Sequence, residues 1–212
     1  MKASNYKYLI AIIFIFFGEQ IAAEDRIVIN FESPPSLNQE AKLIQNIKNY
    51  NSVQSIENYL MQQNWIENFL IKSSFFGKFH QIFIQSKKPK YVWKDKFYID
   101  SQVSTFAYDG GYPDLIRLNM PLEFLTFWIK AENQYITLFN DLSLTIRSVS
   151  FQPAVGWYLI TSDALRVNLG DDLSNDTYQK LSFTLKYMFE NNLTPSIIDL
   201  RYKAGAALNY GK

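Results

Sequence analysis

The order of hydrophobic patterns in the first half of the chain is the feature that most constrains the fold. In chain order there is a strand pattern at 26–31, helix patterns at 36–49 and 53–63, and strand patterns at 65–74, 78–89 and 91–106. Pro34-Pro35 separates the first strand from the first helix, and Ser36 is a residue type that caps helices. Two helices over one face of a small sheet make a stable two-layer unit. We therefore expect an α+β domain over residues 26–108.

A turn cluster, YDGGYPD at 108–114, predicts a domain boundary. Beyond it the patterns predict a helix from Pro121 to about Asn140, three strands at 143–151, 155–163 and 165–170, a second helix ending near Asn191, and two closing strands. Asp176 and Gln179 have the spacing of a capping pair for that second helix. In the strand 165–170, Arg166 and Asn168 share the face opposite the apolar residues. The prediction is a second α+β domain, 115–212, with a mostly antiparallel sheet.

The last strand pattern, 205–210, carries almost no side-chain bulk. In the strand before it, Ile198, Leu200 and Tyr202 share one face, and Asp199 and Arg201 share the other. A strand this small cannot build a core, but its small residues would let another backbone approach. One interpretation is an edge strand that takes a partner strand. The alternative is ordinary internal pairing, with Arg201 bonded to Asp199.

The N-terminus has the features of a targeting segment. Lys2 and Lys7 precede an uncharged, mostly apolar run at 8–18, and Ala22-Ala23 lies before two acidic residues. This predicts either a membrane anchor or a cleaved signal peptide at 8–23. Both alternatives place the remaining residues outside the cytoplasm.

No pattern in the sequence predicts catalysis or a bound cofactor. The 212 residues include no cysteine and one histidine, His80, which excludes thiol chemistry and predicts no catalytic triad or zinc site. His80 is expected at a surface or edge position. Asp171-Asp172 suits the start of a helix, and Gly110-Gly111 lacks the lysine of a phosphate loop. A net charge of +1 argues against nucleic-acid binding. We expect no catalytic residue, metal ion or cofactor.

Three blocks of sequence, in matching order, resemble the FtsQ/DivIB family of bacterial cell-division proteins. The first is the C-terminal IDLRYKAGAALNY, 198–210; the second is Trp157 followed by LRVNLG and a helix with Leu181 and Phe183; the third is residues 65–100, with Trp65-Ile66, Lys88-Pro89 and Tyr98-Ile99-Asp100. The resemblance spans about residues 26–210.

The resemblance implies an inner-membrane protein with a cytoplasmic stub at 1–7 and one membrane span. It also implies a periplasmic POTRA domain at 26–108 with the order β-α-α-β-β, and a β domain at 115–212. It implies a non-enzymatic scaffold at the division septum that binds FtsB and FtsL, helps control septal peptidoglycan synthesis, and contacts other division proteins through the POTRA domain. FtsB would add as a strand at the C-terminal edge. The positions matched to that contact are Arg201, Tyr202, Ala204, Gly205, Ala206, Asn209 and Tyr210.

Two other functions are weighed against this one. A periplasmic POTRA-containing factor for outer-membrane assembly or secretion would bind extended substrates through the first domain. A periplasmic hydrolase with a cleaved signal would need a nucleophile and base, or a metal cluster, which the sequence does not contain.

Overall fold

The computed structural model describes residues 26–74, 79–203 and 205–211. The chain folds into two compact units: the first contains the described residues up to Pro89 and Asp100–Tyr112, and the second contains Lys90–Ile99 and the described residues from Pro113 onward. None of the helices among the described residues is long and apolar enough to cross a membrane. The predicted anchor or signal segment, 8–23, lies outside the described residues.

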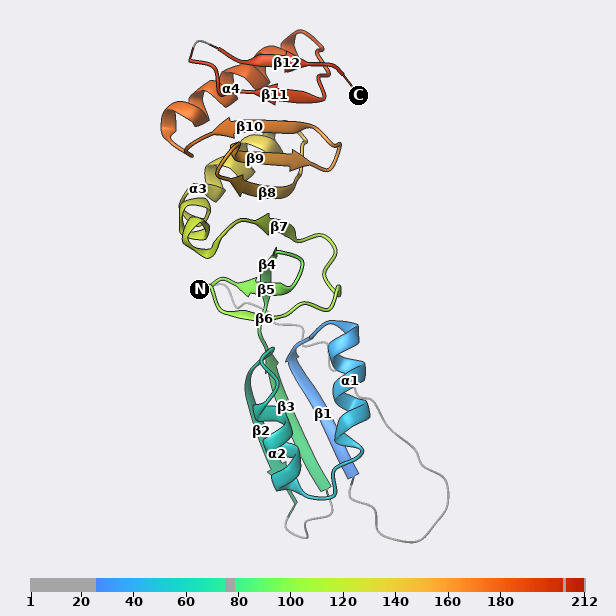
Figure 1. The fold of residues 1–212 in the computed structure, drawn as a ribbon. Coiled ribbons are helices and arrows are strands. Elements are labelled where there is room, and N and C mark those ends of the chain that lie inside the picture. The colour runs from blue at the N-terminus through green and yellow to red at the C-terminus, as the bar shows by residue number, and fades with distance from the viewer. Residues whose placement is uncertain (1–25, 75–78, 204, 212) are drawn as a thin grey trace, which may run out of the picture. The chain divides into compact units, whose positions relative to one another are not determined.

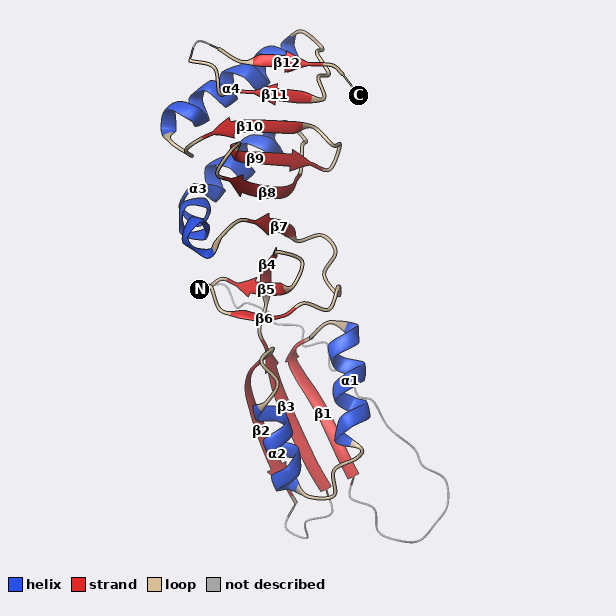
Figure 2. Ribbon diagram, in the orientation of Figure 1, coloured by secondary structure: helices blue, strands red, loops and turns tan. Residues whose placement is uncertain are grey.

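The first unit has the element order expected from its periodicities (Figures 1 and 2). The elements are β1 (Arg26–Ser33), α1 (Leu37–Ile47), α2 (Val53–Met61), β2 (Ile66–Ser73) and β3 (Phe79–Ser86), with the short β6 (Thr105–Ala107) following later. The sheet order is β1-β3-β2; β1 is parallel to β3, and β2 is antiparallel to it. Both helices bury one apolar stripe, contributing Leu43, Ile47, Ile56 and Leu60 to the core.

Serine hydroxyls cap three of the helices. Ser36 accepts from the backbone of Gln39 in a full capping box, which confirms the predicted start of α1. At the start of α2 the Ser52 hydroxyl accepts from the backbone N–H of Ser55. For the last helix the predicted Asp176–Gln179 pair is wrong: Ser174 is the capping residue, and its hydroxyl accepts from the backbone of Thr177. Asp176 instead lies in the first turn, where its charge complements the helix dipole.

The second unit contains a sheet and two helices. Its strands are in the order β12-β11-β10-β9-β8-β7-β4-β5. Its elements are β4 (Pro89–Trp93), β5 (Phe97–Asp100), β7 (Ile116–Asn119), α3 (Leu122–Asp141), β8 (Ile146–Gln152), β9 (Gly156–Thr161), β10 (Arg166–Gly170), α4 (Asn175–Glu190), β11 (Ile197–Asp199) and β12 (Ala207–Asn209). Helices α3 and α4 lie over one face of it in Figure 2. Residues of that face and of both helices form a single core, which includes Trp128, Leu159, Val167, Leu185 and Ile198.

The α+β class is confirmed for the described residues, and most paired residues of the second sheet lie in antiparallel pairings. These join β8 to β9, β9 to β10 and β11 to β12. Three pairings are parallel: β4 with β7, β7 with β8, and β10 with β11. In the last two of these a helix connects the paired strands, as parallel neighbours require.

The segment 90–99 groups with the second unit, which differs from the expected division at 108–115. Strand β4 pairs with β7, Tyr91 and Ile99 are buried in the second core, and Lys90 forms an ion pair with the buried Glu132 of α3. The single strand expected at 91–106 is wrong, because the chain turns at Lys94 and Asp95. Both have φ of 52°, the left-handed conformation that a tight hairpin turn needs.

Candidate functional site

Strand β12 is the last strand of its sheet, and β11 pairs with its inner edge. Its three residues align antiparallel with β11, with Ile198 opposite Leu208. Ile198 is fully buried, and Leu208 packs against the same core. Within the described part of the chain no strand pairs with the outer edge of β12. An unpaired edge presents backbone N–H and C=O groups that another strand can bind.

The segment that leads into β12 is held by a lysine from α4. The ammonium of Lys180 donates to the backbone oxygens of Leu200, at 3.1 Å, and Tyr202, at 2.7 Å. Leu200 is buried, whereas the Tyr202 side chain is 58% exposed. Gly205 has a φ of +88°, a conformation that L side chains rarely adopt, so the glycine is explained by the backbone itself. Ala206 packs against the core, and Ala204 lies outside the described residues.

The residues after β12 are tied back to the start of β11. The backbone N–H of Ser196 donates to the carbonyl of Asn209 at 2.8 Å, and its hydroxyl donates to the carbonyl of Gly211 at 2.6 Å. Asn209 is exposed, and the Tyr210 side chain is 55% exposed. Tyr210 also borders a pocket of about 650 Å³ with Leu165, Met188, Leu193 and Pro195.

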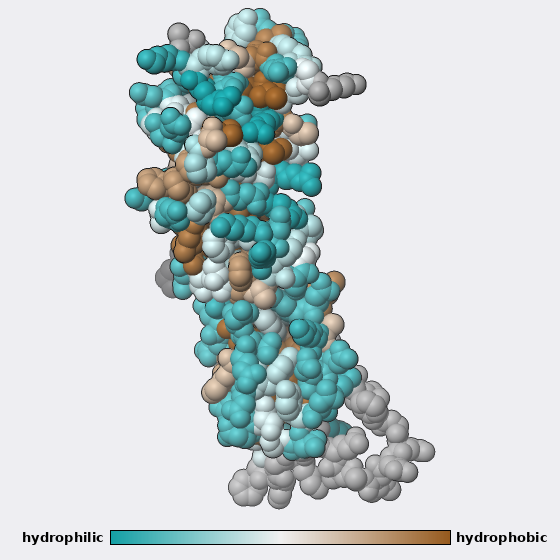
Figure 3. Space-filling model, in the orientation of Figure 1, coloured by the Kyte–Doolittle hydropathy of each residue, from teal (hydrophilic) through white to brown (hydrophobic). Residues whose placement is uncertain are grey.

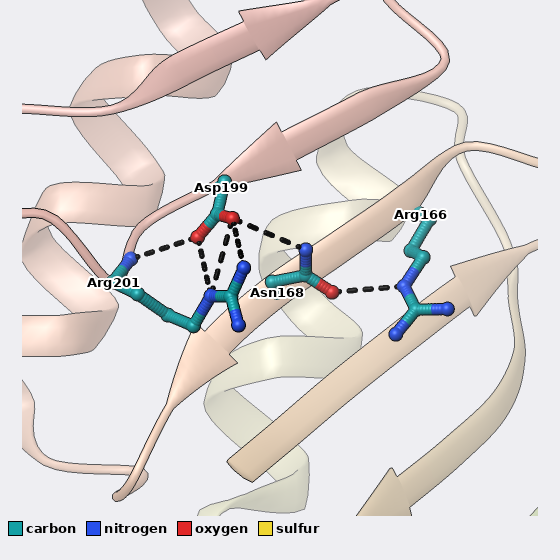
Figure 4. A network of polar contacts seen from close by, with 4 residues as sticks. All are labelled: Arg166, Asn168, Asp199 and Arg201. Carbon is teal, nitrogen blue, oxygen red and sulfur yellow. Dashed lines mark hydrogen bonds and ion pairs between the residues drawn. The ribbon is translucent and has the colours of Figure 1, made fainter. Parts of the chain in front are cut away.

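A polar network crosses the sheet face beside these residues (Figure 4). The Asp199 carboxylate accepts from the Arg201 guanidinium, with Nε–Oδ1 at 2.9 Å and Nη2–Oδ2 at 2.6 Å, and from the Arg201 backbone N–H. On its other side it accepts from the amide of Asn168 at 3.5 Å. The Asn168 side-chain oxygen in turn accepts from Nε of Arg166 at 2.8 Å. Four residues on two strands and one loop are thereby linked.

The Arg201 side chain stabilises the ionised form of Asp199. The hydrogen bonds from the Arg201 side chain lower the pKa of this carboxyl below its ordinary value, and partial burial opposes them. The same pair raises the pKa of Arg201. Asp199 is therefore ionised at neutral pH, and the network carries fixed charges.

The structure brings most of the residues matched to a partner contact into one place. Arg201, Tyr202, Gly205, Ala206, Asn209 and Tyr210 all lie between the end of β11 and the tail that follows β12. The sequence left open whether Arg201 serves a partner or Asp199, and the structure pairs it with Asp199. Sequence reasoning missed Asn168, Arg166 and Ser196 as neighbours of this edge. The alternation in LRVNLG had placed Arg166 and Asn168 on one face, but not beside Asp199.

His80 and Asp172, two polar residues singled out from the sequence, each form hydrogen bonds within the protein. His80 was expected near the surface; this is wrong, since it is 6% exposed on the inner face of β3 and contacts the Ser73 hydroxyl at 2.8 Å. Hydrogen bonds from the side chain and backbone of Ser174, and from the Thr177 hydroxyl, lower the pKa of Asp172 near the start of α4. Among the described residues there is no group of three or more His, Cys, Asp or Glu residues that could hold a metal ion.

Comparison with known proteins gives one distant relative. No model of a known protein family matches the chain. The chain is similar to cell division protein FtsQ of Aliivibrio fischeri, with 20% identity over 166 residues, which is 74% of this chain and 62% of the relative. The chain thus spans less than two thirds of that relative's length. The similarity confirms the resemblance to FtsQ identified from the sequence blocks.

Proposed function

We propose that this chain, a distant relative of FtsQ, is a non-enzymatic scaffold of the bacterial cell-division machinery. It would bind FtsB and FtsL at the division septum and thereby help control septal peptidoglycan synthesis. The observation that carries this proposal is the outer edge of β12, which no described strand pairs; buried residues hold the other side of β12 against the sheet. Such an edge offers main-chain hydrogen bonds for affinity and neighbouring side chains for specificity.

The proposed contact places FtsB as an added strand along β12. Tyr202 precedes that strand in the sequence and Tyr210 follows it, and both side chains are more than half exposed. Tyrosine is enriched in binding hot spots. Arg201, Ala204, Gly205, Ala206 and Asn209 complete the proposed site. Because Arg201 is already paired with Asp199, its proposed role is to fix the segment that leads into β12. In this proposal it does not form an ion pair with the partner.

We assign the first unit as a POTRA domain that contacts other division proteins. Its β-α-α-β-β order and its three-stranded sheet with two helices support this assignment. The apolar segment 8–23 would anchor the protein in the inner membrane by a single span, with both units in the periplasm.

Localisation in dividing cells tests the proposed function. A fluorescent fusion to the full chain should form a band at midcell whose appearance coincides with constriction. Depletion of the protein should give filamentous cells with segregated chromosomes. A uniform envelope signal and normal division after depletion would contradict the proposal and favour a POTRA-containing factor for outer-membrane assembly or secretion.

A further inference from the structure

Arg166, at the start of β10, is held in a fixed orientation on the sheet. Its guanidinium carbon lies 4.2 Å from the centroid of the Tyr158 ring on the neighbouring strand. Its Nε donates to the side chain of Asn168, which is 6% exposed. Tyr158 is itself fixed by a hydrogen bond from Gln152 at 3.1 Å. A stacked and hydrogen-bonded guanidinium loses little freedom when a ligand binds it.

No described residue forms an ion pair with Arg166. Among the described residues no carboxylate lies within ion-pair distance of it, whereas Arg117 pairs with Asp95 and Arg201 with Asp199. Asp199 belongs to the same network but reaches Arg166 only through Asn168 (Figure 4). An arginine has five N–H donors, and the fork formed by its two terminal nitrogens suits a carboxylate. Within the described residues the side-chain hydrogen bond of Arg166 uses one donor, Nε, and leaves this fork available.

Half-buried apolar side chains border this cation. In the strand register Arg166 lies between Ile160 of β9 and Ile197 of β11, on the face opposite the buried Val167. The helices of the second unit pack against the Val167 side and leave the Arg166 side uncovered by any described helix, with Arg166 itself half-buried. Figure 3 shows this face over β9 to β11 as hydrophobic residues set among hydrophilic ones. Charge pairs are stronger in such partly apolar surroundings than in open water.

We propose that Arg166 binds the carboxylate of an aspartate or glutamate in the protein segment that adds to β12. The proposal rests on the proposed function and identifies the chemistry of that partner. Charge complementarity supports it: Asp199 neutralises Arg201, so the face beside the edge keeps a positive charge at Arg166.

The spacing of the strands locates the acidic residue in the partner. Strand β10 is two strands from β12, so an added strand would lie three spacings away, or about 14 Å. An extended chain covers that distance in about four residues. The acidic residue therefore lies outside the partner's pairing strand, in a flanking segment that crosses the uncovered face and brings apolar side chains to Ile160 and Ile197.

Calorimetric titration of the full chain, in detergent micelles, with the extracytoplasmic segments of FtsB and FtsL from the same cell tests this inference. Arg166→Ala should raise Kd on the order of tenfold to a hundredfold, the effect of losing a charge-assisted hydrogen bond. Arg166→Lys should restore only part of the affinity, because it keeps the charge and loses the fork. Arg147→Ala, which removes an exposed arginine from β8, is the matched control and should change Kd less than about twofold.

An exchange of charges between Arg166 and the partner distinguishes a lost contact from a folding defect. Each acidic residue of the partner segments is replaced in turn by lysine, and one such variant should regain binding to Arg166→Glu. Unchanged affinity in folded Arg166→Ala, or equal losses in Arg166→Ala and Arg147→Ala, would overturn this inference and leave the proposed function standing. Absence of binding by the folded wild-type chain would contradict the proposed function, and this inference with it.

Discussion

The guanidinium of Arg201 forms a two-point ion pair with the carboxylate of Asp199, two residues earlier in the chain. The pair closes a short loop in which the Arg201 backbone N–H also donates to Asp199. Asp199 ends β11, so the contact fixes the direction in which the chain leaves the sheet towards β12. An arginine that the sequence offered as a partner contact thus also has a local structural role.

Replacing Asp199 with alanine should destabilise the second unit modestly. The Arg201 side chain is 46% exposed, so solvent screens the pair and the expected loss is about 0.5–1 kcal/mol in the free energy of unfolding. Urea unfolding followed by tryptophan fluorescence measures it. Glu190→Ala is the control, because it removes an exposed pair with Lys186 at 3.8 Å and should have a smaller effect. Equal losses in the two variants would mean that the Asp199 pair has no special role.

The contribution of Asp199 to stability should be lost at low pH. Its pKa in the folded protein is lowered, so its contribution is complete above the unfolded pKa, near 4, and is lost as pH falls through the folded value. The difference in unfolding free energy between wild type and Asp199→Asn should stay constant from pH 8 to about 5 and shrink below about 4. A difference that disappears already near pH 6, or that grows as pH falls below about 4, contradicts the assignment.

Removing the Lys180 ammonium should loosen the segment before β12. Lys180→Met keeps the aliphatic stem but loses both bonds to the backbone, at a cost of about 1–2 kcal/mol after allowance for solvent. Hydrogen exchange should become faster for the amides of residues 205–209. Lys186→Met, on the same helix, serves as the control and should leave that exchange unchanged. Unaltered exchange in Lys180→Met would show that the core residues alone hold the segment.

Two tyrosines of equal exposure should differ in their effect on partner binding. Tyr202 is 58% exposed beside β12, and Tyr187 is 57% exposed on α4. Tyr202→Ala should weaken binding of the FtsB–FtsL segments by tenfold or more, the size expected for a hot-spot residue. Tyr187→Ala should bind as tightly as wild type. The reverse result in calorimetry would move the proposed interface from the strand edge to the helix.

The elements of the fold follow from local sequence far better than their pairing does. Ser36 with Gln39 specifies the start of α1, and the apolar spacing of residues 122–141 specifies α3. The turn at Lys94 and Asp95 carries no glycine, and Asp95 alone is only a weak turn signal, so its left-handed backbone is hard to predict locally. The grouping of 90–99 with the second unit depends on pairing between β4 and β7, which no local pattern reports.

The candidate site, too, could be predicted from local sequence only in part. The residues between Asp199 and Tyr210 are adjacent in sequence, so their pattern could be interpreted directly. Arg166 and Asn168 join them because β10 lies parallel to β11 after an intervening helix, which places Asn168 opposite Asp199 across 31 positions of sequence. That register is set by burial of Val167 against Ile198, a tertiary preference that alternation alone does not fix.

Hydrogen exchange of the full chain, with and without the extracytoplasmic segments of FtsB and FtsL, tests the central claim most directly. The account predicts that partner binding slows exchange of the β12 amides, Ala207–Asn209, while the edge strand β2 of the first unit, Ile66–Ser73, exchanges as before. Bound partner with unchanged exchange in β12, or with new protection only in β2, would contradict strand addition at the C-terminal edge.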